Sequence, residues 1–281
     1  MNRTNIPWCD LTWNPITGCT RGCDYCYARK VAARFGVGAT KELAADFTPT
    51  CHPYRLSQPL DRKKPAIIFI GSMGDVFDPA IPDEFRDRIF ATVAAAHWHT
   101  FVVLTKRAKE MKRYVTEMRL AGRGASALWR DHGIQTDSAW WLNNFPNLIL
   151  GVSVTNQADA DERIPLLLDT PAAKRMVSVE PMLGPVDLGD YVWEHDERDY
   201  GRDHLDFVVV GGKTPGKPLH EQHGLEWNTE LGPSDYLRSL RDQCFAAGVP
   251  LHYKHGGTNP ALDGVVYDWR PDTAQSAEEE E

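Results

Sequence analysis

Short apolar runs rich in β-branched residues recur along the chain and alternate with amphipathic segments. The clearest runs are Ala66–Ile70, Thr100–Leu104, Leu148–Val154, Arg175–Val179 and Asp206–Val210, with a weaker one at Val249–Tyr253. Continuous apolar strands of this kind are typical of a parallel sheet that helices cover. Leu11–Trp13 is a candidate for the first strand.

Helical patterns fall between these runs. In Ile81–Trp98, three apolar side chains recur at intervals of four residues: Phe85, Ile89 and Val93. In Pro233–Gly248, Leu237, Leu240 and Cys244 share one face, and Gly248 can end the helix. This alternation predicts an α/β fold with right-handed crossovers, and six or seven units favour a full or partial parallel barrel. A doubly wound sheet is the alternative.

One region breaks the alternation. Residues 121–147 contain three tryptophans and little periodicity, which indicates an insertion that either covers a site or packs on the outside. We expect one domain over residues 1–257. Residues 258–281 are expected to form a C-terminal tail that is flexible at its end, since it finishes in SAEEEE.

Composition narrows the class of protein. The first residues lack the apolar core of a signal peptide, and no apolar run approaches the length of a membrane span. We therefore expect a cytoplasmic protein with no membrane partner. A formal net charge of −8 over 281 residues argues against tight nonspecific nucleic-acid binding by the whole chain, although it leaves room for a local basic groove.

Three cysteines lie close together near the N-terminus, as C-x3-C-x2-C at Cys19, Cys23 and Cys26. Clustered cysteines in a reducing compartment more often hold a metal than form disulfides. Structural zinc normally takes four ligands, which Cys51 or His52 could complete, so a zinc-stabilised, non-catalytic binding module is one alternative. A 4Fe–4S cluster held by three thiolates would keep one iron open for a small molecule. An iron–sulfur electron carrier is a third interpretation, but an electron carrier does not need the polar and glycine residues that follow the predicted strands, described below.

With the aromatic Tyr25 before its last cysteine, this motif resembles the signature of the radical S-adenosylmethionine (SAM) superfamily. The segments TWNPITGC, CYA, LTKR, GVSV, SVEPMLGPVDL, VVVGG and SLRDQC…AGVP further resemble a phage-associated radical-SAM-like family of unassigned function, from about Trp13 to Lys254. The resemblance implies a partial (β/α)6-type barrel, a 4Fe–4S cluster, SAM and a reducing electron donor. It implies an enzyme that cleaves SAM reductively and abstracts hydrogen from a substrate, for which a nucleotide or nucleic acid is plausible.

A barrel places its functional residues at the carboxyl ends of its strands. Polar or glycine residues follow the predicted strands at Ser72, Asp75, Lys106, Ser153, Asn156, Glu180 and Gly211. The resemblance implies that these positions bind SAM, with Lys106 at its carboxylate, Ser153 and Asn156 at its ribose, and the Gly211 backbone at its adenine. Asp75 and Asn156 could instead cap helices. The chain departs from the family pattern at Lys213 and at Lys254–Gly257, two positions that could touch the substrate.

Overall fold

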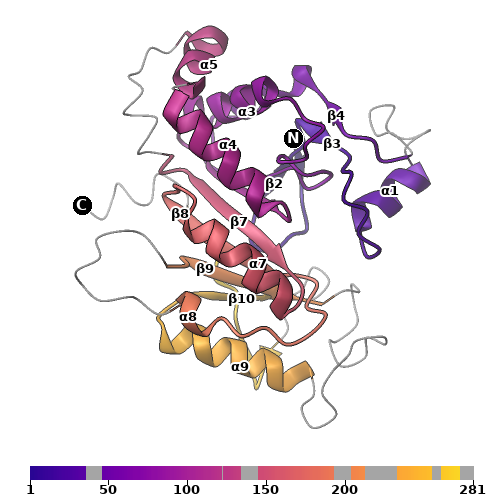
Figure 1. The fold of residues 1–281 in the computed structure, drawn as a ribbon, viewed down its shortest axis with the longest axis vertical. Helices are drawn as coiled ribbons and strands as arrows, with labels where there is room; N and C mark the ends of the chain where they lie inside the picture. The colour runs from indigo at the N-terminus through magenta and orange to yellow at the C-terminus, as the bar shows by residue number, and fades with distance from the viewer. Residues whose placement is uncertain are drawn as a thin grey trace.

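The computed structural model describes residues 1–35, 46–121, 123–133, 145–192, 204–212, 233–254 and 261–272. They form a mixed α/β fold around an eight-stranded, mostly parallel sheet that curls into a half-barrel flanked by helices (Figure 1). In their order across the sheet, the strands are β1 (Asn2–Arg3), β2 (Leu11–Trp13), β5 (Ile67–Ile70), β6 (Thr100–Thr105), β7 (Leu148–Val154), β8 (Lys174–Val179), β9 (Phe207–Gly211) and β10 (Leu251–Lys254).

The strand order explains the curl. From β2 to β10 each strand pairs in parallel with the next sheet strand along the chain, and β1 alone is antiparallel. A doubly wound sheet would reverse its strand order at a switch point and place helices on both faces. Here the order never reverses, so the crossovers put their helices on one face. The doubly wound alternative is therefore not adopted.

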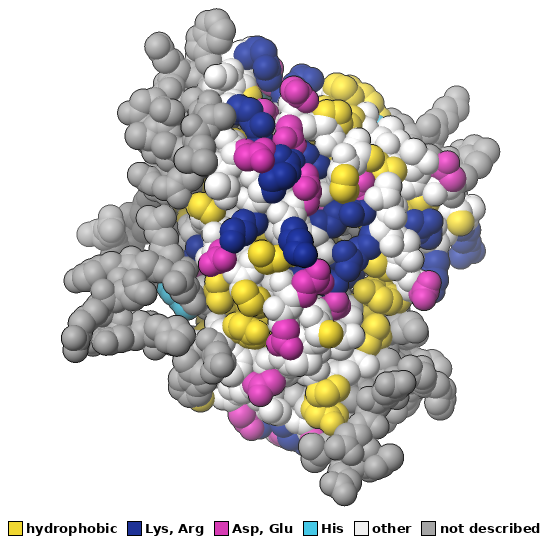
Figure 2. Space-filling view, viewed as in Figure 1, with side chains coloured by type: hydrophobic (Ala, Val, Ile, Leu, Met, Phe, Trp, Pro, Cys, Tyr) yellow, Lys and Arg dark blue, Asp and Glu magenta, His cyan; other side chains and the backbone are white. Residues whose placement is uncertain are grey.

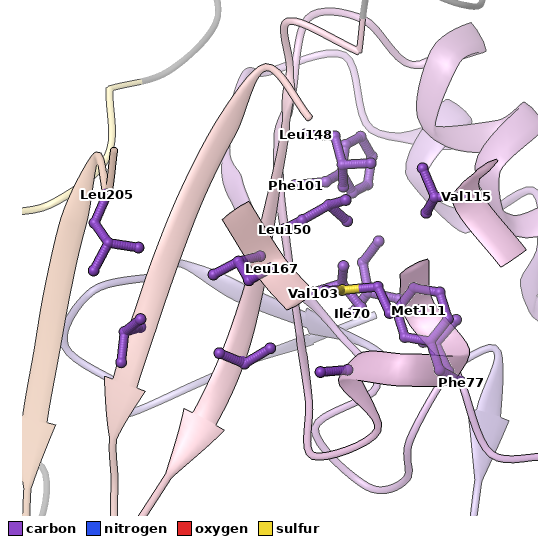
Figure 3. Packing of buried hydrophobic residues seen from close by; sticks show 14 of the residues in the cluster. Ile70, Phe77, Phe101, Val103, Met111, Val115, Leu148, Leu150, Leu167 and Leu205 are labelled. Carbon is purple, nitrogen blue, oxygen red and sulfur yellow. The ribbon is translucent and has the colours of Figure 1, made fainter. Parts of the chain in front are cut away.

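Most of the described helices cover the convex face of the sheet, whereas the first of them packs beside the cysteine loop (Figure 1). They are α1 (Tyr27–Phe35), α2 (Gln58–Asp61), α3 (Asp83–Ala95), α4 (Ala108–Ala121), α5 (Arg123–His132), α7 (Gln157–Leu168), α8 (Gly189–Val192) and α9 (Pro233–Ala246), with a 3-10 turn, η1, at Pro53–Arg55. Figure 3 shows part of the core beneath them, where Met111 and Val115 of α4 face Phe101, Val103 and Leu150 of the strands.

Most strand predictions are confirmed to within two residues at each end, and Leu148–Val154 matches β7 at both ends. The helix predicted over Ile81–Trp98 is shorter, because α3 begins at Asp83 with Pro82 as its N-cap. Its three periodic side chains are buried as expected. Cys244 is fully buried on α9, and Gly248 lies just beyond that helix with a φ of +68°.

The predicted insertion is partly helical. Residues 123–132 form α5, which packs against α3 and α4 on the outside of the fold, far from the carboxyl ends of the strands (Figure 1). Arg88 of α3 binds Asp131 of α5 at 3.0 Å, which ties the two helices together. This part of the insertion therefore packs outside and does not cover the strand ends. Trp140 and Trp141 lie outside the described residues.

The segment after residue 260 returns to the sheet. Strands β11 (Ala261–Leu262) and β12 (Val265–Val266) form a hairpin, and the Tyr253 amide then donates to the Tyr267 carbonyl at 2.8 Å. Trp269 packs against Phe207. Residues 261–272 are thus attached to the half-barrel. Residues 273–281 lie outside the described part, so the flexible acidic end stays a prediction.

Two smaller features complete the fold. Strands β3 (Ile16–Thr17) and β4 (Thr50–Cys51) form an antiparallel pair beside α1 (Figure 1).

Among the described helices, none has both the length and the apolar character that crossing a membrane requires.

Candidate functional site

The concave face of the sheet changes from apolar to polar along the strands. One cluster of buried side chains on this face contains no helical residue. It joins Trp8 and Cys9 to alternate residues of the strands, namely Ile67, Val102, Ile149, Met176, Phe207 and Val209. Two or more residues further along, the same face holds Lys106, Ser153, Ser178, Glu180, Gly211 and Lys254. An apolar floor with polar groups at the carboxyl ends is a suitable place for a ligand.

The cysteine loop is fixed across these strand ends by two glycines. Gly18 forms a bridge with Gly74, and its amide donates to the Met73 carbonyl at 2.9 Å. A Cβ on Gly74 would lie 2.7 Å from Ile16 and 2.8 Å from the Gly18 oxygen. A Cβ on Gly18, whose φ is +86°, would lie 2.2 Å from the Thr48 oxygen. Only glycine allows this close approach of the two loops.

Asp78 holds the loop from the other side. Its fully buried carboxylate accepts from the Thr20 amide at 2.8 Å, the Thr20 hydroxyl at 2.9 Å and the Arg107 guanidinium at 3.0 Å. Burial alone would raise the pKa of Asp78, but the hydrogen bonds from Thr20 and Ala80 and the charge of Arg107 lower it overall. An ionised Asp78 therefore joins the residue after Cys19 to the loops that follow β5 and β6.

Asp75 lies nearby in a different environment. Its buried carboxylate accepts from the Thr105 hydroxyl at 2.8 Å and from the Phe77 amide at 3.0 Å. Burial raises the pKa of Asp75 above its usual range in spite of these bonds. The carboxylate predicted to bind SAM is thus used to join the loop after β5 to the end of β6.

The three cysteines are free thiols on one partly exposed loop. The Cys19 sulfur accepts from the Arg21 amide and the Cys26 sulfur from the Arg29 amide, each at 3.4 Å. Both cysteines also pack beside the small apolar group of Ala28, Ala32 and Phe47. Partial burial raises the pKa of Cys19 to about 11. Across the described residues, no group of three or more Cys, His, Asp or Glu is arranged to hold a metal ion.

Tyr25 connects the cysteine loop to two strand ends. The Lys106 ammonium lies 4.9 Å above its ring, and Arg21 donates to the Lys106 carbonyl at 2.8 Å. Burial, followed by the neighbouring Cys23, raises the pKa of Tyr25 to about 12, and Asp159 of α7 contributes as well. The structure therefore brings Tyr25 together with Cys23 and Lys106.

Ser72 belongs to a small polar network in the same area. Asn14 accepts from the Met73 amide at 2.9 Å and donates to the Ser72 hydroxyl at 3.1 Å. The Tyr27 hydroxyl donates to the Ser72 carbonyl at 2.5 Å. The loop after β5 is thus fixed by residues from both sides of the cysteine motif.

Glu180, Gly211 and Lys254 form a second group on the same face. The Lys254 ammonium binds the Glu180 carboxylate at 2.6 Å, and their side chains keep 15% and 26% of their surface exposed. A Cβ on Gly211 would meet Lys254 atoms at 3.1 Å and Glu180 at 3.4 Å, so glycine leaves space for this ion pair. Lys213 lies outside the described residues, as do His255, Gly256 and Gly257.

The last two predicted residues differ in what they do. Asn156 is the N-cap of α7, and its side chain accepts from the Asp159 amide at 2.9 Å, which is the capping role that the sequence also allowed. Ser153 lies on the concave face of β7, and its carbonyl accepts from Arg163 at 2.7 Å. The Ser153 hydroxyl is oriented towards the polar half of the concave face by strand alternation.

Sequence reasoning missed several residues that build the site. Asn14 directly follows the predicted first strand, Thr20 lies between Cys19 and Cys23, and Asp78 lies three residues beyond the polar loop that ends at Asp75. The available signal for Asp78 was its place in a D-x-x-D pair after a strand. Nothing in that pattern indicates which acid is anchored to Thr20.

Comparison with known proteins identifies the relatives of the chain but no activity. A family model described as a protein of unknown function, DUF5131, matches residues 3–264. No curated protein and no solved structure matches significantly.

The expected membership of the radical SAM superfamily, and with it the resemblance to a phage-associated radical-SAM-like family, is wrong. The matching model is that of a family of unknown function, and the described residues do not bring the cysteines into a metal-holding group. A three-cysteine spacing is short, so its presence together with a parallel half-barrel did not suffice to assign the superfamily.

Proposed function

The chain belongs to the DUF5131 family, and we propose that it is an enzyme whose three cysteines hold an iron–sulfur cluster at the mouth of the half-barrel. The observation that supports this is the position of the cysteine loop. It is locked by Gly74 and Asp78 across the polar ends of the strands, where active sites of curled parallel sheets lie. The proposal concerns chemistry and assigns no superfamily.

The residues fit a cluster better than a single ion. Thiolates of one cluster bind different iron atoms, so they need not converge on one point as the ligands of a zinc ion do. The Cys19 and Cys26 sulfurs each accept a backbone N–H, and hydrogen bonds to sulfur tune such clusters. Arg21, Arg29 and Lys106 surround the loop and would offset the negative charge of the thiolates.

We further propose that SAM is the small molecule bound beside the cluster, with a reducing electron donor as partner. A reduced cluster held by these cysteines would supply the electron that breaks a carbon–sulfur bond of the SAM sulfonium, with methionine as the leaving group. Lys106 is positioned to bind the SAM carboxylate, because its ammonium contacts only the ring of Tyr25 among the described residues. Ser153, Glu180 and the Gly211 backbone offer polar groups along the same face. Asp75 contributes by positioning Thr105 and the loop of Lys106.

The finer description of the sheet as a (β/α)6-type partial barrel and a cytoplasmic location belong to the same proposal. Zinc remains the competing metal, and it requires a fourth ligand that converges with the cysteines on one ion.

Anaerobic reconstitution with iron and sulfide tests the metal. We expect about four irons and four sulfides per chain, since a cubane cluster contains these numbers. Cys23→Ala should lower the iron content to background, whereas Cys51→Ala, a partly exposed cysteine outside the motif, should leave it unchanged. One zinc per chain with no bound sulfide would contradict the proposal and support the zinc-stabilised binding module.

A further inference from the structure

Helix α1 presents an exposed face beside the site. It begins directly after Cys26, and Tyr27, Lys30, Val31 and Arg34 are exposed at positions i, i+3, i+4 and i+7. The opposite side, with Ala28 and Ala32, is buried. This spacing puts the four exposed side chains on one stripe of the helix.

Tyr27 lies where this stripe meets the strand ends. Its hydroxyl is fixed on the Ser72 carbonyl at 2.5 Å, while 56% of the residue's surface stays exposed. The hydroxyl end of the side chain is enclosed by protein, and this burial, with smaller contributions from Cys26 and Glu180, raises the pKa of Tyr27 to about 12. The accessible ring is therefore held between the cysteine loop and the loop that follows β5.

The charge of this segment is opposite to that of the chain. Residues 21–34 contain Arg21, Arg29, Lys30 and Arg34 but only one acid, Asp24, whereas the whole chain has a formal charge of −8. Helix α1 itself has no acidic residue. Lys106 adds a further cation beside Arg21. Figure 2 shows Lys and Arg side chains, with acidic side chains among them, across the middle of this view and towards the side where α1 lies in Figure 1.

We propose that the α1 stripe binds a segment of single-stranded nucleic acid, with a base stacked on Tyr27, one phosphate at Lys30 and another at Arg21 of the cysteine loop. Cations that follow the backbone together with an exposed aromatic ring are the features with which proteins bind single strands. The inference rests on the proposed function, for which it names the substrate class: a nucleotide within a strand, delivered to the mouth of the half-barrel.

An acidic protein is the other partner that this charge would attract. The fixed ring of Tyr27 favours a single-stranded nucleic acid over an acidic protein. A stacking surface next to the site is useful for a flat base, whereas electrostatic docking of a protein needs only the cations. Duplex DNA fits less well, because its bases are already stacked and cannot reach Tyr27.

The test is the fluorescence anisotropy of labelled oligo(dT) and oligo(U) with the full chain, before and after cluster reconstitution, between about 50 and 200 mM salt. Tyr27→Ala should weaken binding about 5- to 100-fold, and Tyr27→Phe, which keeps the ring, should weaken it much less. Lys30→Glu should weaken binding and reduce the salt slope by about 0.7 or more. Lys174→Glu makes the same charge change on an exposed lysine at the amino end of β8 and should have no effect.

Each other outcome overturns the inference. The inference fails if the chain does not bind oligonucleotides, or if Lys30→Glu and Lys174→Glu lose the same oligonucleotide affinity. It also fails if the chain binds duplex DNA more tightly than single strands, or if an acidic carrier protein binds this stripe while oligonucleotides do not. Failure of the proposed function is a separate result. In that case the chain would bind oligonucleotides through Tyr27 and Lys30 and yet acquire no iron. Circular dichroism of each variant excludes unfolding as the cause of a loss.

Discussion

The two halves of the carboxyl edge differ in how their polar groups are used. In the loop after β5, the buried carboxylates of Asp75 and Asp78 accept hydrogen bonds from that loop, from the end of β6 and from the cysteine loop. After β8, β9 and β10, Glu180 and Lys254 share one partly exposed ion pair around Gly211. The first half therefore acts as a frame for the cysteine loop. The second half keeps charged groups that a ligand can reach.

Removal of Asp78 tests the frame and should have the largest effect. Asp78→Ala leaves the Arg107 guanidinium, which is 18% exposed, without its carboxylate, and deletes both bonds to Thr20. Breaking a buried ion pair typically costs about 3–5 kcal/mol. We expect the free energy of unfolding in urea to fall by about this amount. A loss below 1 kcal/mol would show that the loop does not depend on Asp78.

The same carboxylate gives a pH dependence. The pKa of Asp78 is lowered in the folded chain, so its stabilisation is complete above the unfolded pKa of about 4 and is lost as the pH falls further. The stability difference between the wild-type chain and Asp78→Asn should therefore be constant from pH 7 to 5 and shrink below about pH 4. Urea unfolding at several pH values measures it. A difference that grows on acidification would contradict the assigned cause.

Gly74→Ala tests the contact between the loops. Its Cβ would lie 2.7 Å from Ile16 and 2.8 Å from the Gly18 oxygen, and overpacking of this kind typically costs about 1–3 kcal/mol. Gly184→Ala in the other half is the control, because the nearest atom of Asn156 lies 3.6 Å away. It should change the free energy of unfolding by less than about 0.5 kcal/mol. Equal costs would remove the distinction between the halves.

Asn156→Ala tests the capping assignment. Loss of an N-cap side chain costs about 1 kcal/mol, so we expect a thermal unfolding shift of a few degrees. Asn156→Asp retains an acceptor for the Asp159 amide and should recover the loss. If Asn156→Ala instead changed only SAM affinity, the prediction that Asn156 binds ribose would be favoured over capping.

Glu180→Gln should have the smallest effect on stability. Partly exposed ion pairs contribute about 1 kcal/mol or less, so the free energy of unfolding should hardly change. Under the proposed function, the formation of 5′-deoxyadenosine from SAM should nevertheless fall, because the variant removes a charge from the half of the edge that a ligand can reach. Unfolding and turnover are measured on the same preparation. A stable variant with full turnover would remove Glu180 from the site.

The sequence indicates the strands well because each is a continuous apolar run, as in Leu148–Val154. It also indicates which loops are polar. It cannot distinguish Asp75 from Asp78, since both follow one strand and only tertiary contacts decide which donors each receives. Asn156 shows the same limit, because a residue that can cap a helix can also bind a hydroxyl. The pairing of Glu180 with Lys254 joins residues 74 positions apart and leaves no local pattern.

The most direct test of the central claim is the amount of 5′-deoxyadenosine formed when the reconstituted chain is reduced in the presence of SAM. The account predicts this product from the wild-type chain and from Cys51→Ala, and none from Cys19→Ala, Cys23→Ala or Cys26→Ala. A chain that holds about four irons and four sulfides but forms no 5′-deoxyadenosine under reducing conditions would contradict it.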